Sequence, residues 1–246
     1  MNAPVQQKSE GRHKSVPPFY PPPAEPFDTP WQITVYSATH ERERWQRYNE
    51  IANRSYAVRG LKSVGEERHI DIDQYPTYFA EATVNGSAPI GGVRVHTPSP
   101  HGWLPLQEEL TGYTDMESLQ LLCQELMPEG ICHGGGLWIN PKRRLRGLAG
   151  DLARACFVMF AVTRARWYLG AGHQYVLDTW ASLGWHPTAK FPTFPYPDER
   201  YESYVLLGNQ DTWPKDLRIW TAEQTENVVL NGQSAQFVVQ PMRLKK

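Results

Sequence analysis

The stretch NPKRRLRGLAG at residues 140–150 decides how this chain is interpreted. An apolar, glycine-rich run typical of a buried strand precedes it at 131–139, and the longest helical pattern in the chain follows it from Gly147 to about Tyr168. A glycine where a helix begins lets a ligand approach the backbone, and the first-turn N–H groups attract phosphate because they have no helical partner. Strand, basic loop and helix together predict an anion site. Charge alone would favour a solvated basic loop, and a nucleic-acid patch is the other alternative.

Composition limits the function classes that remain. The chain has 246 residues, of which 40% are hydrophobic and 21% charged, so it can bury a sizeable core. Its formal net charge of -1 leaves no global basic field to hold a nucleic acid. The cysteines form no CxxC pair, no apolar run reaches the roughly 18 residues of a membrane span, and the N-terminus lacks the layout of a signal peptide. We therefore expect a cytoplasmic protein that binds no nucleic acid and does not span a membrane.

The distribution of proline and of apolar patterns divides the chain into three regions. Residues 1–30 hold eight of the 21 prolines and predict an extended Pro-rich tail, with a ligand for a proline-reading domain as the alternative. Residues 31–210 carry strand and helix patterns in turn. Residues 211–246 predict a C-terminal extension with a β-hairpin around Asn231-Gly232.

The patterns between 31 and 210 predict an α/β domain. Alternation predicts strands near 31–35, 69–73, 78–84, 89–96, 167–170 and 201–207, and helical spacing predicts helices over 45–56, 119–126 and 174–182. Thr39 is the expected N-cap of the first helix, and Thr114 with Glu117 is the expected capping box of the second. Asn85-Gly86 predicts a hairpin turn. This order is typical of a mixed central sheet flanked by helices.

The motif Arg144-x-x-Gly147-x-Ala149 resembles the pyrophosphate-binding motif of the GNAT superfamily of acyl-CoA transferases. The hairpin at 78–96 resembles the second and third strands of that fold, and the short strand after the long helix resembles its fifth. The helix that ends in Leu-Gly-Trp at 183–185 resembles the one that usually ends in Leu-Gly-Phe. The resemblance covers roughly residues 31–207 and implies a GNAT-type sheet.

A narrower resemblance is to the acyl-homoserine-lactone synthase branch and its relatives, the long-chain N-acyl amino acid synthases. It rests on YAVRG at 56–60, HIDID at 69–73, GVR at 92–94 and a long insertion before the next strand. These enzymes take acyl groups from an acyl carrier protein or acyl-CoA. Where they carry Glu followed by Ser-Arg, this chain has HGGG at 133–136, which argues against homoserine-lactone chemistry.

The GNAT resemblance implies a thioester co-substrate, either acyl-CoA or acyl carrier protein, and specific donor contacts. A backbone N–H near Trp138 or Ile139 would polarise the thioester carbonyl. The residues that would hold the pyrophosphate are Arg144, Gly147, Leu148 and Ala149.

Acyl transfer to an amine requires a base for the amine and an acid for the leaving thiolate. His133 is the candidate base because imidazole titrates near neutral pH, and a core histidine is an equal alternative. The resemblance implies a Tyr as the acid, four residues before the Gly of Leu-Gly-Phe, but Trp180 stands at that position. Tyr175, one to two turns earlier, is the substitute candidate.

Two aspartates and an arginine are the candidates for contacting the amine substrate. The resemblance implies this role for Asp71 and Asp73, while their alternation with isoleucines favours a half-buried strand over a metal site shared with His69. Arg94 lies on an otherwise apolar strand, and a buried arginine needs an anionic partner. That partner is one of these aspartates or a substrate carboxylate. No zinc-binding spacing or hydrolase motif occurs, so we expect no metal.

Together these patterns predict an N-acyltransferase that moves an acyl group from acyl-CoA or acyl carrier protein to a small-molecule amine. The insertion at 97–130 is expected to help form the acceptor or acyl pocket, and a homodimer is compatible with the sequence. Two alternatives stay open. One is a synthase of the acyl-homoserine-lactone type that uses S-adenosylmethionine, and the other is a non-catalytic GNAT-fold module that binds acyl-CoA.

Overall fold

The computed structural model describes residues 31–61, 70–142, 145, 147–230 and 236–239. The predicted Pro-rich tail, His69 of the acidic stretch and Arg144 of the phosphate motif lie outside these residues. The turn expected at Asn231-Gly232 also lies outside them.

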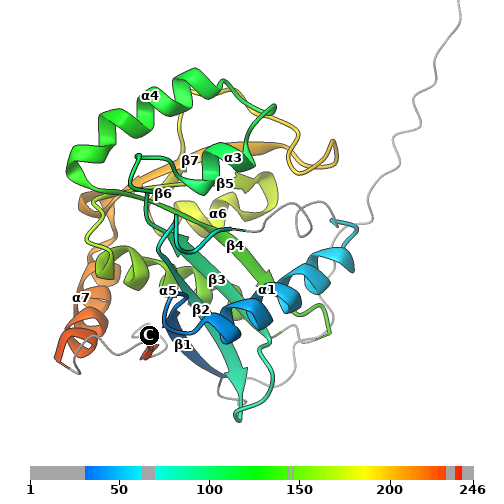
Figure 1. Cartoon of the computed structure of the whole chain (residues 1–246), viewed down its shortest axis with the longest axis vertical. Coiled ribbons are helices and arrows are strands. Elements are labelled where there is room, and N and C mark those ends of the chain that lie inside the picture. Colours follow the sequence, from blue (N-terminus) through cyan, green and yellow to red (C-terminus); the bar gives the residue numbers. More distant parts are fainter. Residues whose placement is uncertain (1–30, 62–69, 143–144, 146, 231–235, 240–246) are drawn as a thin grey trace, which may run out of the picture.

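An eight-stranded sheet runs through the molecule in the order β6-β7-β5-β4-β3-β2-β1-β8 (Figure 1). Its strands are β1 (Trp31–Ser37), β2 (Thr77–Val84), β3 (Gly91–His96), β4 (Ile131–Ile139), β5 (Trp167–His173), β6 (Trp185–Pro187), β7 (Ser203–Asn209) and β8 (Gln236–Val239). Neighbouring strands are antiparallel except β4 and β5, which are parallel because helix α5 (Leu148–Val162) crosses between them. The predicted mixed sheet is confirmed.

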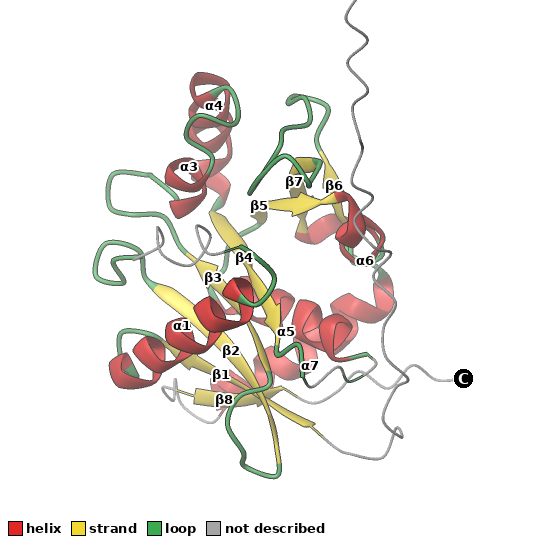
Figure 2. Ribbon diagram, turned by 90° about the vertical axis from the view of Figure 1, so that its right-hand side faces the viewer, coloured by secondary structure: helices red, strands yellow, loops and turns green. Residues whose placement is uncertain are grey.

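Helices cover both faces of this sheet (Figure 2). One face carries α1 (Arg42–Ala57), α3 (Pro105–Glu109) and α4 (Met116–Leu126), and the other carries α5 and α7 (Lys215–Leu230). Short helical segments are η1 (Met127–Glu129) after α4, η2 (Gln174–Val176) and α6 (Leu177–Ala181) after β5, and η3 (Gln210–Thr212) after β7. Among the described residues, no helix is both long enough and apolar enough to cross a membrane.

Local backbone signals account for two boundaries. Asn85 and Gly86 have φ values of 49° and 69°, as the predicted Asn-Gly turn between β2 and β3 requires. The long helix begins after Gly147 as predicted but ends at Val162, earlier than expected. Arg164 has a φ of 58°, and this left-handed residue turns the chain from the helix into β5.

Both predicted helix caps were wrong. α4 begins after Asp115, whose carboxylate accepts hydrogen bonds from the N–H groups of Glu117 and Ser118, so Asp115 replaces Thr114 as the cap. α1 begins after Glu41 without a side-chain cap, and the hydroxyl of Thr39 lies too early in the chain to serve it. A cap depends on where the first helical turn closes, and spacing alone left that open by one to three residues.

The C-terminal region contains a helix that was not predicted. The expected β element exists as β8, but it pairs with β1 instead of closing a hairpin with the residues before it. Those residues form α7, which packs on α5. Over residues 215–226, where the burial of α7 is described, its buried residues are Leu217, Trp220, Thr221 and Gln224. Two of these four are polar, so the apolar helical pattern is weak.

Candidate functional site

β4 and β5 pair over three residues and then separate (Figure 2). The last pair is His133 with Leu169, and from there residues 134–139 and 170–173 continue without pairing to each other. We call this region the split. Glycines at its vertex let the backbones meet, because a Cβ on Gly170 would lie 2.6 Å from the carbonyl oxygen of Gly134. The split is therefore narrow at His133 and wider toward Ile139.

The edge of β4 that faces the split offers backbone hydrogen-bonding groups. The N–H of Asn140 bonds to the carbonyl of Ile90 on the β3 side, so by strand alternation the N–H and C=O of Ile139 point toward the split. The Ile139 carbonyl accepts a hydrogen bond from Nη2 of Arg59 at 2.9 Å. Of the two residues expected to polarise a thioester, Ile139 thus presents its N–H to the split. The side chain of Trp138 is 1% exposed and packs on Tyr48.

The helix that begins beside the split has an accessible N-terminus. Gly147 is exposed and has a φ of +90°, and among the described residues the atom nearest to a Cβ built on it is 4.0 Å away, in the ring of Trp31. A left-handed backbone and open space are what the predicted phosphate loop requires. Leu148 is fully buried and its N–H donates a hydrogen bond to the carbonyl of Leu145 at 3.3 Å, whereas Ala149 is half-buried.

Asp151, in the first turn of α5, is a residue that the sequence did not single out. It accepts a hydrogen bond from Nε1 of Trp31 at 3.0 Å and pairs with Arg154. These contacts connect the start of β1 to the start of α5. The carboxylate of Asp151 lies near the expected phosphate site, and Trp31 and Arg154 donate hydrogen bonds to it.

His133 lies at the vertex of the split and is 1% exposed. Its Nε2 is 3.9 Å from Oε2 of Glu109, the last residue of α3. The other oxygen of this carboxylate accepts a hydrogen bond from the hydroxyl of Tyr196 at 2.8 Å. An imidazole beside a carboxylate can hold a proton near neutral pH, which is the chemistry that a base for an amine needs.

His96 is the cross-strand neighbour of His133, with ring centroids 5.4 Å apart. Thr77 donates its hydroxyl proton to the carbonyl of Tyr75 at 2.6 Å, and the same oxygen lies 2.8 Å from Nδ1 of His96. The hydroxyl has one proton, so toward His96 it accepts, and Nδ1 of His96 carries the hydrogen. Sequence patterns could not find this neighbour, because it depends on the register between β3 and β4.

Arg94 is 6% exposed and lies against a bulge in β4. A Cβ on Gly136, which has a φ of +65°, would be 2.8 Å from Nε of Arg94, so the glycine makes room for the guanidinium. Nη1 of Arg94 is 3.4 Å from Oδ1 of Asn49. The prediction of a buried arginine on this strand is confirmed.

The acidic stretch after residue 69 forms a turn, so the predicted strand was wrong over 70–73. The N–H of Tyr75 bonds to the carbonyl of Asp71 at 2.8 Å, and the Asp71 carboxylate accepts the N–H of Asp73. Asp73 is exposed and forms an ion pair with Arg42. Aspartate side chains that bond to nearby backbone favour turns over strands. The structure thus places Asp71 and Asp73 at the surface, and the carboxylate of Asp73 is engaged by Arg42.

The end of β5 carries a titratable group beside the split. His173 is the last residue of β5, where burial lowers its pKa and the nearby Arg59 guanidinium lowers it further. Tyr175, the substitute acid, is 69% exposed, and its ring centroid is 5.7 Å from that of His173. Trp180 is instead 5% exposed and packs on Trp185 in the core.

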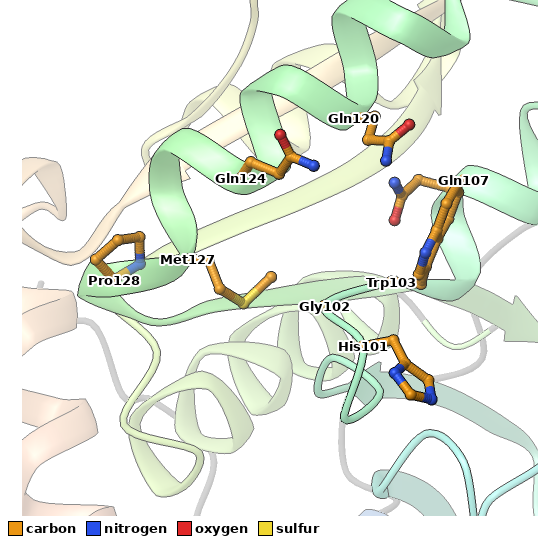
Figure 3. A pocket seen from close by; sticks show the side chains of 8 residues that line it. All are labelled: His101, Gly102, Trp103, Gln107, Gln120, Gln124, Met127 and Pro128. Atoms are coloured by element: carbon orange, nitrogen blue, oxygen red, sulfur yellow. The ribbon is translucent and has the colours of Figure 1, made fainter.

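The insertion at 97–130 also forms a cavity of about 260 Å³ on its outer side (Figure 3). Its lining contains three glutamines, one tryptophan and one methionine, among the residues His101, Gly102, Trp103, Gln107, Gln120, Gln124, Met127 and Pro128. Gln107 lies two residues before Glu109 on α3, a spacing at which two side chains of a helix do not share a face. Among the described residues, no three His, Cys, Asp or Glu side chains gather as a metal site.

Comparison with known proteins places the fold. No protein-family model matches the chain. An uncharacterised protein of Mycobacterium tuberculosis and one of Mycobacterium bovis are each 24% identical over 192 residues, which cover 75% of this chain and 71% of theirs. The CoA-dependent acyl-homoserine lactone synthase MesI aligns with a TM-score of 0.52 and 16% identity, over 79% of this chain and 95% of that one. FeeM, an N-acyl amino acid synthase from uncultured soil microbes, aligns with a TM-score of 0.50 and 12% identity, over 75% and 95%.

The chain has the fold of these synthases. The GNAT-type architecture expected from the sequence is confirmed, and so is the resemblance to this branch, at the level of the fold.

Proposed function

We propose that this protein is an N-acyltransferase that moves an acyl group from a CoA or carrier-protein thioester to a small-molecule amine. The observation that carries the proposal is the split, which begins at a buried histidine and opens beside a helix with an accessible N-terminus. An extended thioester arm could lie along the unpaired edge of β4 while its phosphates meet the start of α5. The fold shared with two acyl-transferring synthases supports this assignment.

In the proposed reaction the amine lone pair attacks the thioester carbonyl carbon. A C–N bond forms, the C–S bond breaks, and the thiolate leaves with the bonding electron pair and takes up a proton. His133 receives the proton that the amine loses, and the N–H of Ile139 stabilises the negative charge that develops on the carbonyl oxygen. Tyr175 is the proposed proton donor to the thiolate.

Substrate contacts are assigned to cations and to the helix start. Arg144 and the backbone at 147–149 would hold the donor phosphates. Arg94 would receive a carboxylate of the acceptor, because its guanidinium is a buried positive charge that lies against the bulge of β4. Asp71 and Asp73 stay candidates for contacting the amine from the surface turn in which they lie.

The donor site is tested by replacing Gly147 with alanine. A Cβ at a φ of +90° strains the loop and narrows the backbone approach, so we expect the affinity for CoA and acyl-CoA to fall by about tenfold. Gly112→Ala is the matched control, because Gly112 has a φ of +84°, has no described atom within 4 Å of a Cβ built on it and lies between α3 and α4. Calorimetric titration measures both variants. Equal affinities for the two variants would refute the helix start as the phosphate site.

The acyl transfer itself is tested by thiol release from a panel of acyl-CoA and acyl carrier protein donors with amino acids and other primary amines. Mass spectrometry of molecules that copurify with the protein narrows the panel. Turnover with an amine establishes the reaction, and donor hydrolysis without an acylated amine would contradict it.

A further inference from the structure

Three consecutive residues of α3 have separate surroundings. Gln107 lines the outer cavity (Figure 3), and its Oε1 accepts the N–H of Leu104 at 2.7 Å. Glu108 accepts a hydrogen bond from the hydroxyl of Tyr75 at 2.7 Å. Glu109 faces His133. The insertion therefore places the carboxylate of Glu109 at the vertex of the split. The hydrogen bonds of Gln107 and Glu108 hold α3, the helix that carries Glu109, in place.

We propose that Glu109, held by Tyr196, is the positioning residue for His133 in acyl transfer. This inference rests on the proposed function. Glu109 lies on the Nε2 side of the ring, at 3.9 Å, and favours a hydrogen on Nε2, which leaves the lone pair of a neutral imidazole on Nδ1. Nδ1 is then the atom that takes the proton of the amine.

The charge of Glu109 acts on the product of that proton transfer. When His133 accepts the proton it becomes an imidazolium, while Glu109 stays a carboxylate throughout, so the pair changes from one negative charge to none. An opposite charge at this distance in a buried site stabilises the imidazolium and makes His133 a stronger base. Tyr196 supports this geometry because its hydroxyl occupies the other carboxylate oxygen at 2.8 Å.

Other charged and titratable side chains also lie around the imidazole of His133. His96 and Arg94 come from β3, and Glu109 comes from α3 with Tyr196 behind it. His96 holds its hydrogen on Nδ1 through Thr77, and Arg94 is a fixed positive charge. Glu109 is the negative group that the described structure places beside His133, and its removal should have an effect distinct from that of its neighbours.

The test compares Glu109→Gln with Glu108→Gln. Both variants remove one negative charge from α3 by the same chemistry, and the glutamine at 109 still offers Tyr196 an oxygen to bond. In the wild type, turnover should rise with pH as His133 loses its proton. Glu109→Gln should move the midpoint of that rise to lower pH by about one unit, because the imidazolium loses its counter-charge, and should lower the limiting rate by about tenfold. Glu108→Gln should leave midpoint and rate unchanged.

An NMR titration of the His133 ring in the full chain gives a readout that does not need turnover. Its midpoint should shift in Glu109→Gln in the same direction as the kinetic midpoint, and Tyr196→Phe should lower the rate with a smaller shift. A shifted NMR midpoint with an unchanged kinetic profile would overturn the inference, and so would the absence of both shifts. If the wild type transfers no acyl group from any donor, the proposed function itself fails.

Discussion

Toward α5, the sheet presents apolar and aromatic side chains, whereas toward α1 and α3 it buries ionisable ones. On the α5 side, Trp185 packs edge to face with Phe160 at 5.7 Å and with Tyr168 at 5.5 Å. The charged and imidazole side chains that the strands bury lie on the other side and are Glu81, Arg94, His96 and His133.

Successive residues of β4 serve the two faces. A Cβ on Gly134 would meet Phe160 and Trp185, while a Cβ on Gly135 would meet the ring of His133. Burial of aromatic surface stabilises the fold, and burial of charge costs free energy unless partners compensate. The residues on the polar face are thus kept at some expense of stability, which is the pattern expected of a functional site. Because successive side chains of a strand point to opposite faces, β4 contributes to the apolar core on one face and to the candidate site on the other.

The largest effect is expected on the apolar face. Trp185→Ala should lower the free energy of unfolding by about 3–5 kcal/mol, because the indole is 1% exposed and fills the space beneath the vertex glycines. Trp103→Ala removes the same group where it is 39% exposed and should lower the free energy of unfolding by about 1–2 kcal/mol, clearly less than Trp185→Ala. Urea unfolding measures both. Equal losses of unfolding free energy in the two variants would show that the α5 face of the sheet contributes no more to stability than the insertion does.

On the polar face, His133→Gln should lower turnover by about 10²-fold or more and remove most of the dependence of turnover on pH. Thioester binding should persist, since the helix start lies at the other end of the split. A core histidine predicts the opposite pattern, in which stability falls by about 1–3 kcal/mol and the folded fraction keeps its rate. The thermal midpoint and the single-turnover rate of the same variant distinguish the two.

The smallest effect concerns Glu81, which is 1% exposed with one oxygen 3.0 Å from Arg44. Burial raises the pKa of Glu81 by more than Arg44 lowers it. A raised pKa in the folded state gives stability below the unfolded value of about 4.5 that is lost as pH rises through the folded pKa. Glu81→Gln cannot ionise, so its stability relative to the wild type should increase across that pH range. Urea unfolding midpoints of both proteins, measured from pH 4 to 7, test this. The prediction fails if the midpoint of the variant minus that of the wild type falls as pH rises.

Features that depend on nearby residues could be predicted from the sequence. The Asn-Gly turn, the glycine before α5 and the apolar run of β4 each act through their own backbone or their immediate neighbours. The alternation at 70–73 misled because the carboxylate of Asp71 bonds to the backbone two residues on, and this local bond overrides a periodic pattern. Over residues 215–226 of α7, where burial is described, two of the four buried residues are polar, so helical spacing gave a weak signal there.

The sequence by itself determined the fold class and the glycine at which the long helix begins, and it named His133 as the candidate base, because glycine geometry and imidazole chemistry are properties of single residues and short motifs. Tertiary structure decided what surrounds His133. Strand register brought His96 opposite it, and the insertion brought Glu109 to it from 24 positions earlier in the chain. Both placements depend on contacts between segments that are distant in the sequence, so no short stretch of sequence specifies them.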